Sequence, residues 1–394
     1  MVDAHPMRLA YVTVGKADDV REWSGLNAAI RDSLIQQRCI VEDVDRLGTD
    51  YSLTHRLRKR LHSSLFGTTY ALERNPAAAA RWSRIAGDRV KGLTPVDAVV
   101  STGTLPVAFL EGREPLAIWA DATFNSLRQT YPEYGRYARQ SIADGDQVER
   151  TALNRARLIC FASDWAANDA VAYYGISRQK IRVIPFGANC PAPFANAEAA
   201  ARSVAERDWS VTRFAFVGVD WHRKGGELAV AVVRRLNELG TRSTLSVIGC
   251  HPPNEVAALP FVECLGFLSK SNAADRERLH EALLASHFLL VPTLAECFGL
   301  VFAEASAYSL PSISRAVGGV PSAVSSGRTG LLLPAEAGAE AYCDALRPLL
   351  VDRAGYAEMC GEAYRDYTDR LNWRVAGGRF VSELRAVLAD RQQP

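Results

Sequence analysis

The chain has 394 residues, enough for two or three domains with their own cores, which excludes a small scaffold held by disulfides or metals. Apolar residues make up 48% and charged residues 23%, close to the average of globular proteins, so wholesale disorder and a membrane bundle are excluded. Lys and Arg number 46 against 44 Asp and Glu. This balance gives no reason to expect a nucleic-acid partner.

The start of the chain leads directly into a strand-like run at 9–14, without the apolar segment and cleavage site of a signal peptide. No stretch approaches the roughly 18 consecutive apolar residues that a spanning helix needs. The eight cysteines form no Cys-x-x-Cys pair, and several lie in apolar runs, which predicts reduced, buried thiols. Together these features predict a cytoplasmic protein, and they leave peripheral contact with the inner face of the membrane open.

The first half alternates short apolar runs with longer helical patterns. A helix is expected at 25–36, and strands are expected at 9–14, 39–44, 97–101, 115–119, 158–161 and 181–184. Strands that are apolar throughout and separated by helices are typical of a parallel sheet covered on both faces. The pattern predicts a doubly wound α/β domain over residues 1–190.

The same alternation restarts after a polar, Ala-rich stretch at 191–210 that is interpreted as a linker. A second doubly wound domain is predicted over 211–371, with strands at 214–218, 246–249, 288–291 and 311–314 and helices at 225–239, 271–285 and 299–308. An amphipathic helix is expected at 372–391. Since ligands of such sheets bind outside the carboxyl ends of the strands, we expect the chemistry in a cleft between two similar domains.

The most informative segment follows the strand at 288–291 and opens a helix. It contains Glu296 and Glu304, eight residues apart. A turn at Phe298 and Gly299 would leave Glu296 in the loop and Glu304 inside the helix, with the amides of 298–301, including that of Leu300, free to bind an anion. One carboxylate could bind sugar hydroxyls and the other a ribose diol. The alternative is a pair of solvated helix charges.

This segment resembles the Glu-x7-Glu motif of the family 4 retaining glycosyltransferases, members of glycosyl transferases group 1 with the GT-B fold. The resemblance continues through the run Gly318-Gly319-Val-Pro and the later Gly330-Leu-Leu-Leu-Pro334. It covers most of 155–380 well and the N-terminal half loosely. It implies two Rossmann-like domains facing a central cleft, and a terminal helix at 372–391 that packs back on the first domain.

A second motif joins the strand ending at Gly218 to the next helix. A glycine-rich turn and a cation at such a position can bind a diphosphate. Lys224 resembles the family's phosphate-binding lysine, whereas the arginine that usually follows the first glycine is replaced by Val219. Arg223 could supply the missing charge. The alternative for Arg223 and Lys224 is a solvated helix start.

The resemblance implies a nucleoside-diphosphate sugar as the donor. No cofactor is expected, because this donor is a substrate. The run 265–270 resembles the family loop whose backbone contacts the nucleotide base. Cys250 and His251 are adjacent without a second pair at zinc-ligand spacing, and no convincing Asp-x-Asp loop occurs, so no metal site is predicted. Protein cations and helix amides would then stabilise the leaving diphosphate.

In the first domain, the run 23–27 opens a helix, with Ser24 a candidate cap and Gly25 permitting close approach of a phosphate or acceptor. Asp121 ends a strand on the same side and resembles the family position that faces the donor sugar. The alternative roles are a capped helix start for 23–27 and a structural carboxylate for Asp121.

Leucines at 53, 57, 61 and 65 recur at helical spacing beside several cations, which predicts a basic amphipathic helix over 53–65. Such a helix fits an anionic membrane surface or a lipid-diphosphate acceptor. The alternative, which the spacing slightly favours, is a core-packed helix with a solvated basic face.

The residues predict a cleft that binds phosphate. The resemblance implies a retaining, metal-independent hexosyltransferase that moves a sugar from a nucleotide sugar to a saccharide or lipid-linked acceptor, in cell-envelope, exopolysaccharide or glycolipid synthesis. The expected catalytic residues are Asp121, Lys224 and Glu296. The expected donor-binding residues are Gly25, Gly218, Arg223, Lys224, Phe298, Gly299, Leu300 and Glu304. Two alternatives stay open: a nucleotide-sugar epimerase of the same fold, and a non-catalytic protein that binds nucleotide sugars.

Overall fold

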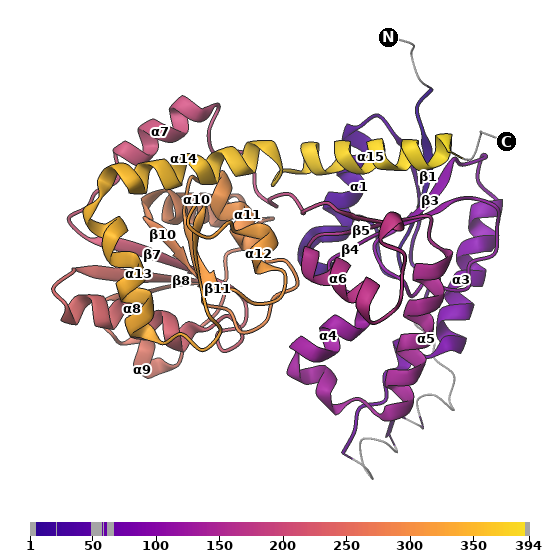
Figure 1. Cartoon of the computed structure of the whole chain (residues 1–394), viewed down its shortest axis with the longest axis horizontal. Coiled ribbons are helices and arrows are strands. Elements are labelled where there is room, and N and C mark those ends of the chain that lie inside the picture. Colours follow the sequence, from indigo (N-terminus) through magenta and orange to yellow (C-terminus); the bar gives the residue numbers. More distant parts are fainter. Residues whose placement is uncertain (1–4, 21, 49–56, 58, 61–66, 391–394) are drawn as a thin grey trace. The chain divides into compact units, whose positions relative to one another are not determined.

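The computed structural model describes residues 5–20, 22–48, 57, 59–60 and 67–390. The chain divides into two compact units (Figure 1). Unit 1 comprises Met1–Pro185 together with Trp373–Pro394, and unit 2 comprises Phe186–Asn372. Each unit contains one six-stranded sheet, and every strand pair in both sheets is parallel.

Unit 1 alternates strands and helices along the chain. Its strands are β1 (Arg8–Val12), β2 (Ile40–Val44), β3 (Ala98–Ser101), β4 (Leu116–Ala120), β5 (Leu158–Phe161) and β6 (Ile181–Val183). Its helices are α1 (Leu26–Gln36), α3 (Pro76–Lys91), α4 (Phe124–Thr130), α5 (Arg139–Arg155), α6 (Asp164–Ala172) and α15 (Trp373–Ala389). Short 3-10 helices are η1 (Glu22–Gly25), η2 (Leu72–Arg74), η3 (Pro132–Arg136) and η4 (Arg178–Lys180).

The strand order in unit 1 is β2-β1-β3-β4-β5-β6. The strands β3, β4 and β5 are buried along their whole length, which explains why their sequences are apolar on both faces. Helices α3 and α5 supply Trp82, Ala86, Val148 and Ala152 to the core of this unit. Helix α3 begins sharply because the Asn75 side chain accepts a hydrogen bond from the Ala77 amide and Pro76 fits the first turn.

Helix α15 completes unit 1, although it is distant in sequence. It packs on α1, where the Gln37 side chain donates to the Arg374 carbonyl at 3.0 Å. Phe380 of α15 stacks on the buried ring of Trp119 in β4, with ring centroids 4.8 Å apart and planes 7° apart. Packing of this kind makes α15 part of the core of unit 1.

Unit 2 has the same alternation. Its strands are β7 (Thr212–Val217), β8 (Ser243–Ile248), β9 (Val262–Gly266), β10 (Phe288–Leu290), β11 (Ser312–Arg315) and β12 (Gly330–Leu333). Its helices are α7 (Ala197–Ala205), α8 (Gly226–Glu238), α9 (Asn254–Ala257), α10 (Ala273–Ala285), α11 (Leu300–Ala307), α12 (Val320–Ala323), α13 (Ala339–Val351) and α14 (Arg353–Asp369).

The strand order in unit 2 is β12-β11-β10-β7-β8-β9, so the order reverses between β7 and β10. In doubly wound sheets, ligands bind outside the carboxyl ends of the strands at this reversal. The loops that follow β7 and β10 therefore define the place to look for a site.

The predicted linker is wrong in one respect, because residues 197–205 form α7, which packs on α14 within unit 2. The run of alanines favours a helix, and the Asn196 side chain caps it by accepting from the Ala199 amide at 2.9 Å.

The sequence analysis did not predict two strands of unit 2, β9 and β12. Both lie at edges of the sheet, and the middle residues of β9 are exposed, which removes the apolar signal.

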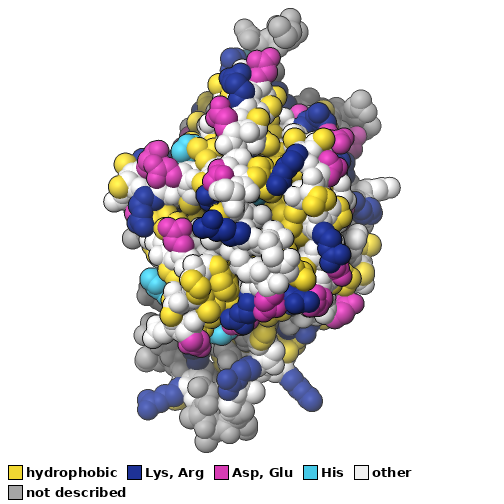
Figure 2. Space-filling model, turned by 90° about the vertical axis from the view of Figure 1, so that its left-hand side faces the viewer, with side chains coloured by type: hydrophobic (Ala, Val, Ile, Leu, Met, Phe, Trp, Pro, Cys, Tyr) yellow, Lys and Arg dark blue, Asp and Glu magenta, His cyan; other side chains and the backbone are white. Residues whose placement is uncertain are grey.

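Among the described residues, none of the helices combines the length and the apolar character required to span a bilayer. Six of the eight cysteines are buried as expected, but Cys264 in β9 is exposed. Most of the predicted basic helix at 53–65 lies outside the described residues; Leu57, Lys59 and Arg60 within it are exposed. On the face of the molecule in Figure 2, acidic and basic side chains are interspersed with apolar ones.

Candidate functional site

Lys224 and Glu296 meet at the switch point of unit 2. Lys224 lies in the loop between β7 and α8, and Glu296 lies in the loop between β10 and α11. Their side chains form an ion pair between Nζ and Oε2, although they are 72 residues apart. Both side chains are largely buried, with exposed fractions of 10% and 12%, so solvent screens this pair weakly.

Arg223 adds a second cation to the same carboxylate. Its Nη1 lies 3.7 Å from Glu296 Oε2 and donates to the Ala295 carbonyl at 2.9 Å. The carbonyl of Arg223 in turn accepts from the Leu294 amide at 2.8 Å. These bonds fix the two loops to each other and hold two positive charges beside one negative charge.

Glycines make this arrangement possible. A Cβ on Gly218 would lie 2.7 Å from Lys224 Cγ, so a side chain there would displace the lysine. Gly318 has φ +51°, and a Cβ on it would collide with the Glu296 carbonyl. The same carbonyl accepts from the Gly319 amide at 3.0 Å, so the Gly318-Gly319 turn packs closely against the backbone of Glu296 and fixes its position.

The start of α11 lies next to this pair. Gly299 is its N-cap residue, with φ +86° and no side-chain cap, so the turn expected at 298–299 is present. The first amides of a helix have no intrahelical acceptor and carry partial positive charge. Phe298 itself is buried and packs edge-on against Phe186, with ring centroids 5.6 Å apart. Its side chain is therefore a packing element.

Glu304 lies in the next turn of α11 and pairs with a different cation. Lys270 Nζ forms an ion pair with Glu304 Oε1, and the two side chains are 46% and 8% exposed. Burial, followed by the nearby charges of Cys190 and Glu304, raises the pKa of Tyr308 well above its usual range. Burial also raises the pKa of the Cys190 thiol, and the charge of Glu304 adds to this. The Glu304 carboxylate is thus buried, beside a counter-ion that is partly exposed.

Val219, which stands where an arginine is usual in the resembled family, is 68% exposed in the β7–α8 loop. Arg223, four residues later, is the cation that approaches Glu296 instead. Among the described residues, no cluster of three or more His, Cys, Asp or Glu side chains is placed to hold a metal ion.

In unit 1, Asp121 and the loop before α1 lie together. Trp23 Nε1 donates to Asp121 Oδ2 at 3.1 Å, which joins the loop before α1 to the end of β4. Trp23, Ser24 and Gly25 have φ values of 48°, 56° and 78°, and the first two are strained in this region. Gly25 is the N-cap of α1 and there is no side-chain cap, so the expectation that Ser24 caps the helix is wrong.

Two residues near these sites were not predicted. Lys270 ends the run 265–270, for which only backbone contacts were expected, and no pattern in the sequence indicates that it pairs with Glu304. Glu149 is fully buried in α5, where it accepts from Thr104 Oγ1 at 2.5 Å, and burial raises its pKa. Its position among Gly145, Val148 and Ala152, on the apolar face of the helix, is a signal that could have identified it.

The comparisons with known proteins agree with this geometry. Residues 211–352 match the family model described as glycosyl transferases group 1. The matched residues lie within unit 2, and this part of the chain is similar to glycosyl transferases group 1. A curated relative in Kribbella flavida, named D-inositol 3-phosphate glycosyltransferase, is 29% identical over 268 residues, which are 62% of this chain and 62% of the relative. The aligned part thus spans less than two thirds of the relative.

Solved structures extend the likeness to the whole chain. Sucrose-phosphate synthase from Thermosynechococcus elongatus has a TM-score of 0.66 and 18% identity, covering 98% of this chain and 100% of that one. Anabaena HepE, solved in complex with UDP-glucose, has a TM-score of 0.61 and 14% identity, covering 97% of this chain and 100% of that one. The chain therefore has the GT-B fold, with two Rossmann-like units.

Proposed function

We propose that this chain is a retaining, family 4 glycosyltransferase of group 1 that moves a hexose from a nucleoside-diphosphate sugar to an acceptor hydroxyl. The observation that carries the proposal is the cluster of Lys224, Arg223 and Glu296 at the switch point of unit 2. A diphosphate requires clustered cations, and a sugar requires a fixed hydrogen-bond acceptor. The cluster supplies both in one small, largely buried space.

In this proposal Lys224 and Arg223 bind the diphosphate, and the amides at the start of α11, with Gly299 and Leu300, assist them. The bond between the anomeric carbon and the diphosphate oxygen breaks, and a bond from the same carbon to the acceptor oxygen forms. The acceptor proton leaves with the diphosphate or to solvent. The cations stabilise the charge that develops on the leaving group, which is the task a metal ion performs elsewhere, and we propose a reaction without a metal.

The ion pairs of Lys224 with Glu296 and of Lys270 with Glu304 fit the same roles. Glu296 would exchange Lys224 for hydroxyls of the donor sugar, and Lys224 would turn to the diphosphate. Glu304 would exchange Lys270 for the ribose diol, which is feasible because the lysine is 46% exposed while the carboxylate stays in place. In each pair the lysine neutralises a buried carboxylate, which would be costly to leave unpaired.

Asp121 and Gly25 are the contributions of unit 1 in this proposal, with Asp121 orienting or polarising a hydroxyl during transfer. The hydrogen bond from Trp23 fixes the carboxylate. The acceptor is proposed to be a saccharide or a lipid-linked saccharide, in cell-envelope, exopolysaccharide or glycolipid synthesis at the cytoplasmic side of the membrane. The name of the curated relative points to a phosphorylated cyclitol as one further acceptor to assay.

A thermal-shift panel of nucleoside diphosphates and nucleotide sugars tests the donor half without an acceptor. A ligand at 100 times its dissociation constant adds about 2.7 kcal/mol of stability, which a melting curve resolves. We expect a selective shift with one nucleotide and its loss in Lys224→Ala. The absence of any shift would contradict the proposed site.

Product analysis then separates the enzyme classes. A transferase forms a glycoside only when donor and acceptor are both present, whereas an epimerase converts the donor alone. A protein that only binds nucleotide sugars gives the thermal shift and no product with any acceptor. Formation of a glycoside with the donor's anomeric configuration supports the proposal, and inversion would overturn its stereochemistry.

A further inference from the structure

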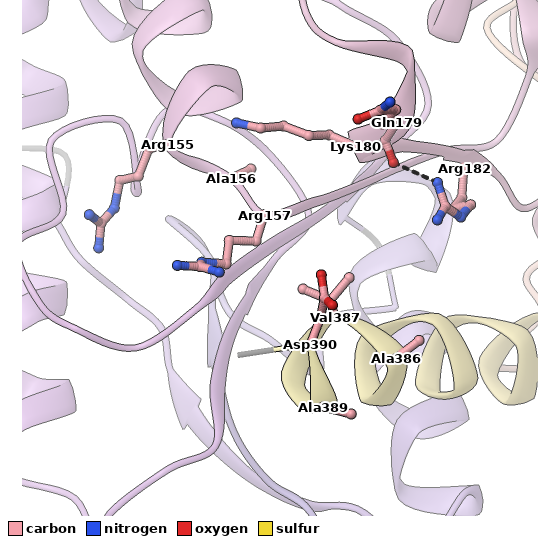
Figure 3. A pocket seen from close by; sticks show the side chains of 10 residues that line it. All are labelled: Arg155, Ala156, Arg157, Gln179, Lys180, Arg182, Ala386, Val387, Ala389 and Asp390. Atoms are coloured by element: carbon pink, nitrogen blue, oxygen red, sulfur yellow. Dashed lines mark hydrogen bonds between the residues drawn. The ribbon is translucent and has the colours of Figure 1, made fainter. Parts of the chain in front are cut away.

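Unit 1 contains a pocket of about 820 Å³ that the proposed function does not use. It is lined by Arg155, Ala156, Arg157, Gln179, Lys180, Arg182, Ala386, Val387, Ala389 and Asp390. Its volume falls in the range of small-molecule sites, roughly 300–1,000 Å³. Figure 3 shows the side chains of Arg155, Arg157 and Lys180 extending toward the same side, above the small residues of α15.

The pocket lies at the opposite edge of the sheet from Asp121. Arg155 and Arg157 immediately precede β5, and Lys180 immediately precedes β6, so they stand at the amino ends of these neighbouring parallel strands. Asp121 follows β4 and stands at the carboxyl edge. The length of a four-residue strand, about 10 Å, separates the two edges. The pocket is therefore distinct from the candidate site of unit 1.

Part of the positive charge in this pocket serves the fold. Arg182 Nε pairs with Glu383 Oε2 at 2.7 Å, and Lys180 Nζ donates to the Asn154 carbonyl at the end of α5, also at 2.7 Å. Arg155 at the last turn of α5 interacts favourably with the helix dipole. These contacts neutralise the charge of Arg182 and partly offset the charges of Lys180 and Arg155.

The rest of the positive charge is matched less completely. The Arg157 guanidinium forms no hydrogen bond or ion pair with another described residue. Arg155 Nε is buried without an acceptor in the described part of the chain, while its Nη2 donates to the Gly112 carbonyl at 3.5 Å. Burial lowers the pKa of Arg155, against the opposing charge of Glu114. Asp390 is the acidic residue in the lining, beside four cationic ones. Like charges gathered around a hollow favour an anion in it.

We propose that this pocket, called here the β5–β6 pocket, binds a phosphorylated small molecule that carries at least two negative charges. Arg157 and Arg155 offer planar donor groups that match phosphate oxygens, and Lys180 adds a point charge. The wall formed by Ala386, Val387 and Ala389 would contact the uncharged body of the ligand. Such a site lies outside the proposed transfer reaction and does not depend on it.

A hollow lined from three directions favours a compact ligand over a bilayer. Its cations come from the end of α5, from the segment before β6 and from β6 itself, while α15 closes one side. Contact with an anionic membrane requires cations that project from a convex surface. A phosphate group on a lipid has the same chemistry, so the experiment includes vesicles as a separate arm.

Calorimetric titration of the full chain with inorganic pyrophosphate tests the proposal, because two sites should appear and should respond to different variants. Lys224→Ala should remove the site in unit 2. The double variant Arg157→Ser with Lys180→Gln should weaken the other site at least tenfold and leave the first unchanged. The matched control is Arg84→Ser with Lys91→Gln, which removes two exposed cations of α3; both binding events should persist in it.

Sedimentation with vesicles of phosphatidylglycerol and phosphatidylcholine forms the second arm. We expect the Arg157/Lys180 variant to sediment like wild type. A single pyrophosphate site that Lys224→Ala abolishes would overturn the proposal. It would also be overturned if the pocket variant lost vesicle binding while pyrophosphate binding stayed intact. Because Arg157 is exposed, unchanged melting temperatures should show that the variant is folded.

Discussion

The two units have the same architecture but different chemistry at equivalent places. Each has six parallel strands, and in each the loops at the carboxyl ends carry the candidate residues. Unit 2 puts Lys224, Arg223 and Glu296 around its switch point. Unit 1 puts Trp23, Gly25 and the carboxylate of Asp121 at the corresponding edge.

This difference indicates that the two units suit different kinds of ligand. A dense group of opposite charges suits a ligand that brings its own charges, such as a diphosphate. An aromatic donor fixing one carboxylate suits a neutral ligand whose hydroxyl needs orientation. The similar sheets therefore indicate little about function, which depends mainly on the side chains at the strand ends.

The largest expected effect comes from unit 2. Lys224→Ala and Glu296→Gln should each lower kcat by about 10²–10³-fold, the range seen when one group that stabilises developing charge is removed. Lys224→Ala should also abolish the nucleotide-induced thermal shift. Initial rates with a saturating acceptor measure the effect, and Arg234→Ala, at an exposed cation of α8, the helix that follows Lys224, is the control. Normal turnover in both site variants would mean that the reaction occurs elsewhere.

A pH effect should also act on unit 2. His287 is buried, its Nδ1 accepts from the Arg213 amide at 3.0 Å, and burial together with the charges of Arg207, Arg213 and Arg353 lowers its pKa to about 3, with Asp208 opposing. Below pH 6.5 the unfolded chain binds the proton and the folded chain does not, so stability falls as the pH drops toward 3.

Between pH 7 and pH 5 this group should cost unit 2 about 2 kcal/mol of unfolding free energy. His287→Gln keeps an acceptor for the Arg213 amide and removes the titration. Hydrogen exchange of the β10 amides measures unit 2, and that of the β4 amides measures unit 1. If acid weakened both units equally, and the variant behaved like wild type, His287 would not be the responsible group.

Much of this fold could be predicted from sequence because the central strands are apolar on both faces and the helices between them have clear ends. The same logic located Lys224 and Glu296, since strand–turn–helix junctions with glycine are visible as patterns. It failed at β9 and β12, which are short or partly exposed edge strands. It also interpreted 191–210 as a linker, although alanines favour the helix α7 that forms there.

The contacts of the candidate sites could not be predicted in the same way. The pairing of Lys270 with Glu304 depends on how the β9 loop approaches α11, and no local pattern encodes that approach. The hydrogen bond from Trp23 to Asp121 joins residues 98 positions apart through strained backbone. Such contacts arise from tertiary packing, which a single sequence specifies only through the whole fold.

A gain of function should follow in unit 2 when the missing cation is restored. Val219 is 68% exposed, so Val219→Arg should leave stability within about 0.5 kcal/mol of wild type. One charge-assisted hydrogen bond to the diphosphate should tighten nucleotide binding about tenfold. Calorimetric titration measures this, and Val171→Arg, at an exposed valine of unit 1, is the control. Equal tightening in both variants would indicate a nonspecific charge effect.

The smallest effect separates the units most clearly. Trp23→Phe keeps the ring but removes the Nε1–H group that Asp121 accepts, and the loss of one such bond should cost unit 1 about 1 kcal/mol. Nucleotide-induced thermal shifts should stay as in wild type, because Lys224 and Arg223, the proposed diphosphate ligands, lie in unit 2, whereas KM for the acceptor should rise. Asp121→Asn should reproduce the KM change, and combining the two should add little, since both act on one contact. A changed nucleotide shift in Trp23→Phe would mean that the diphosphate site depends on this loop, and the division of tasks between the two units would then be wrong.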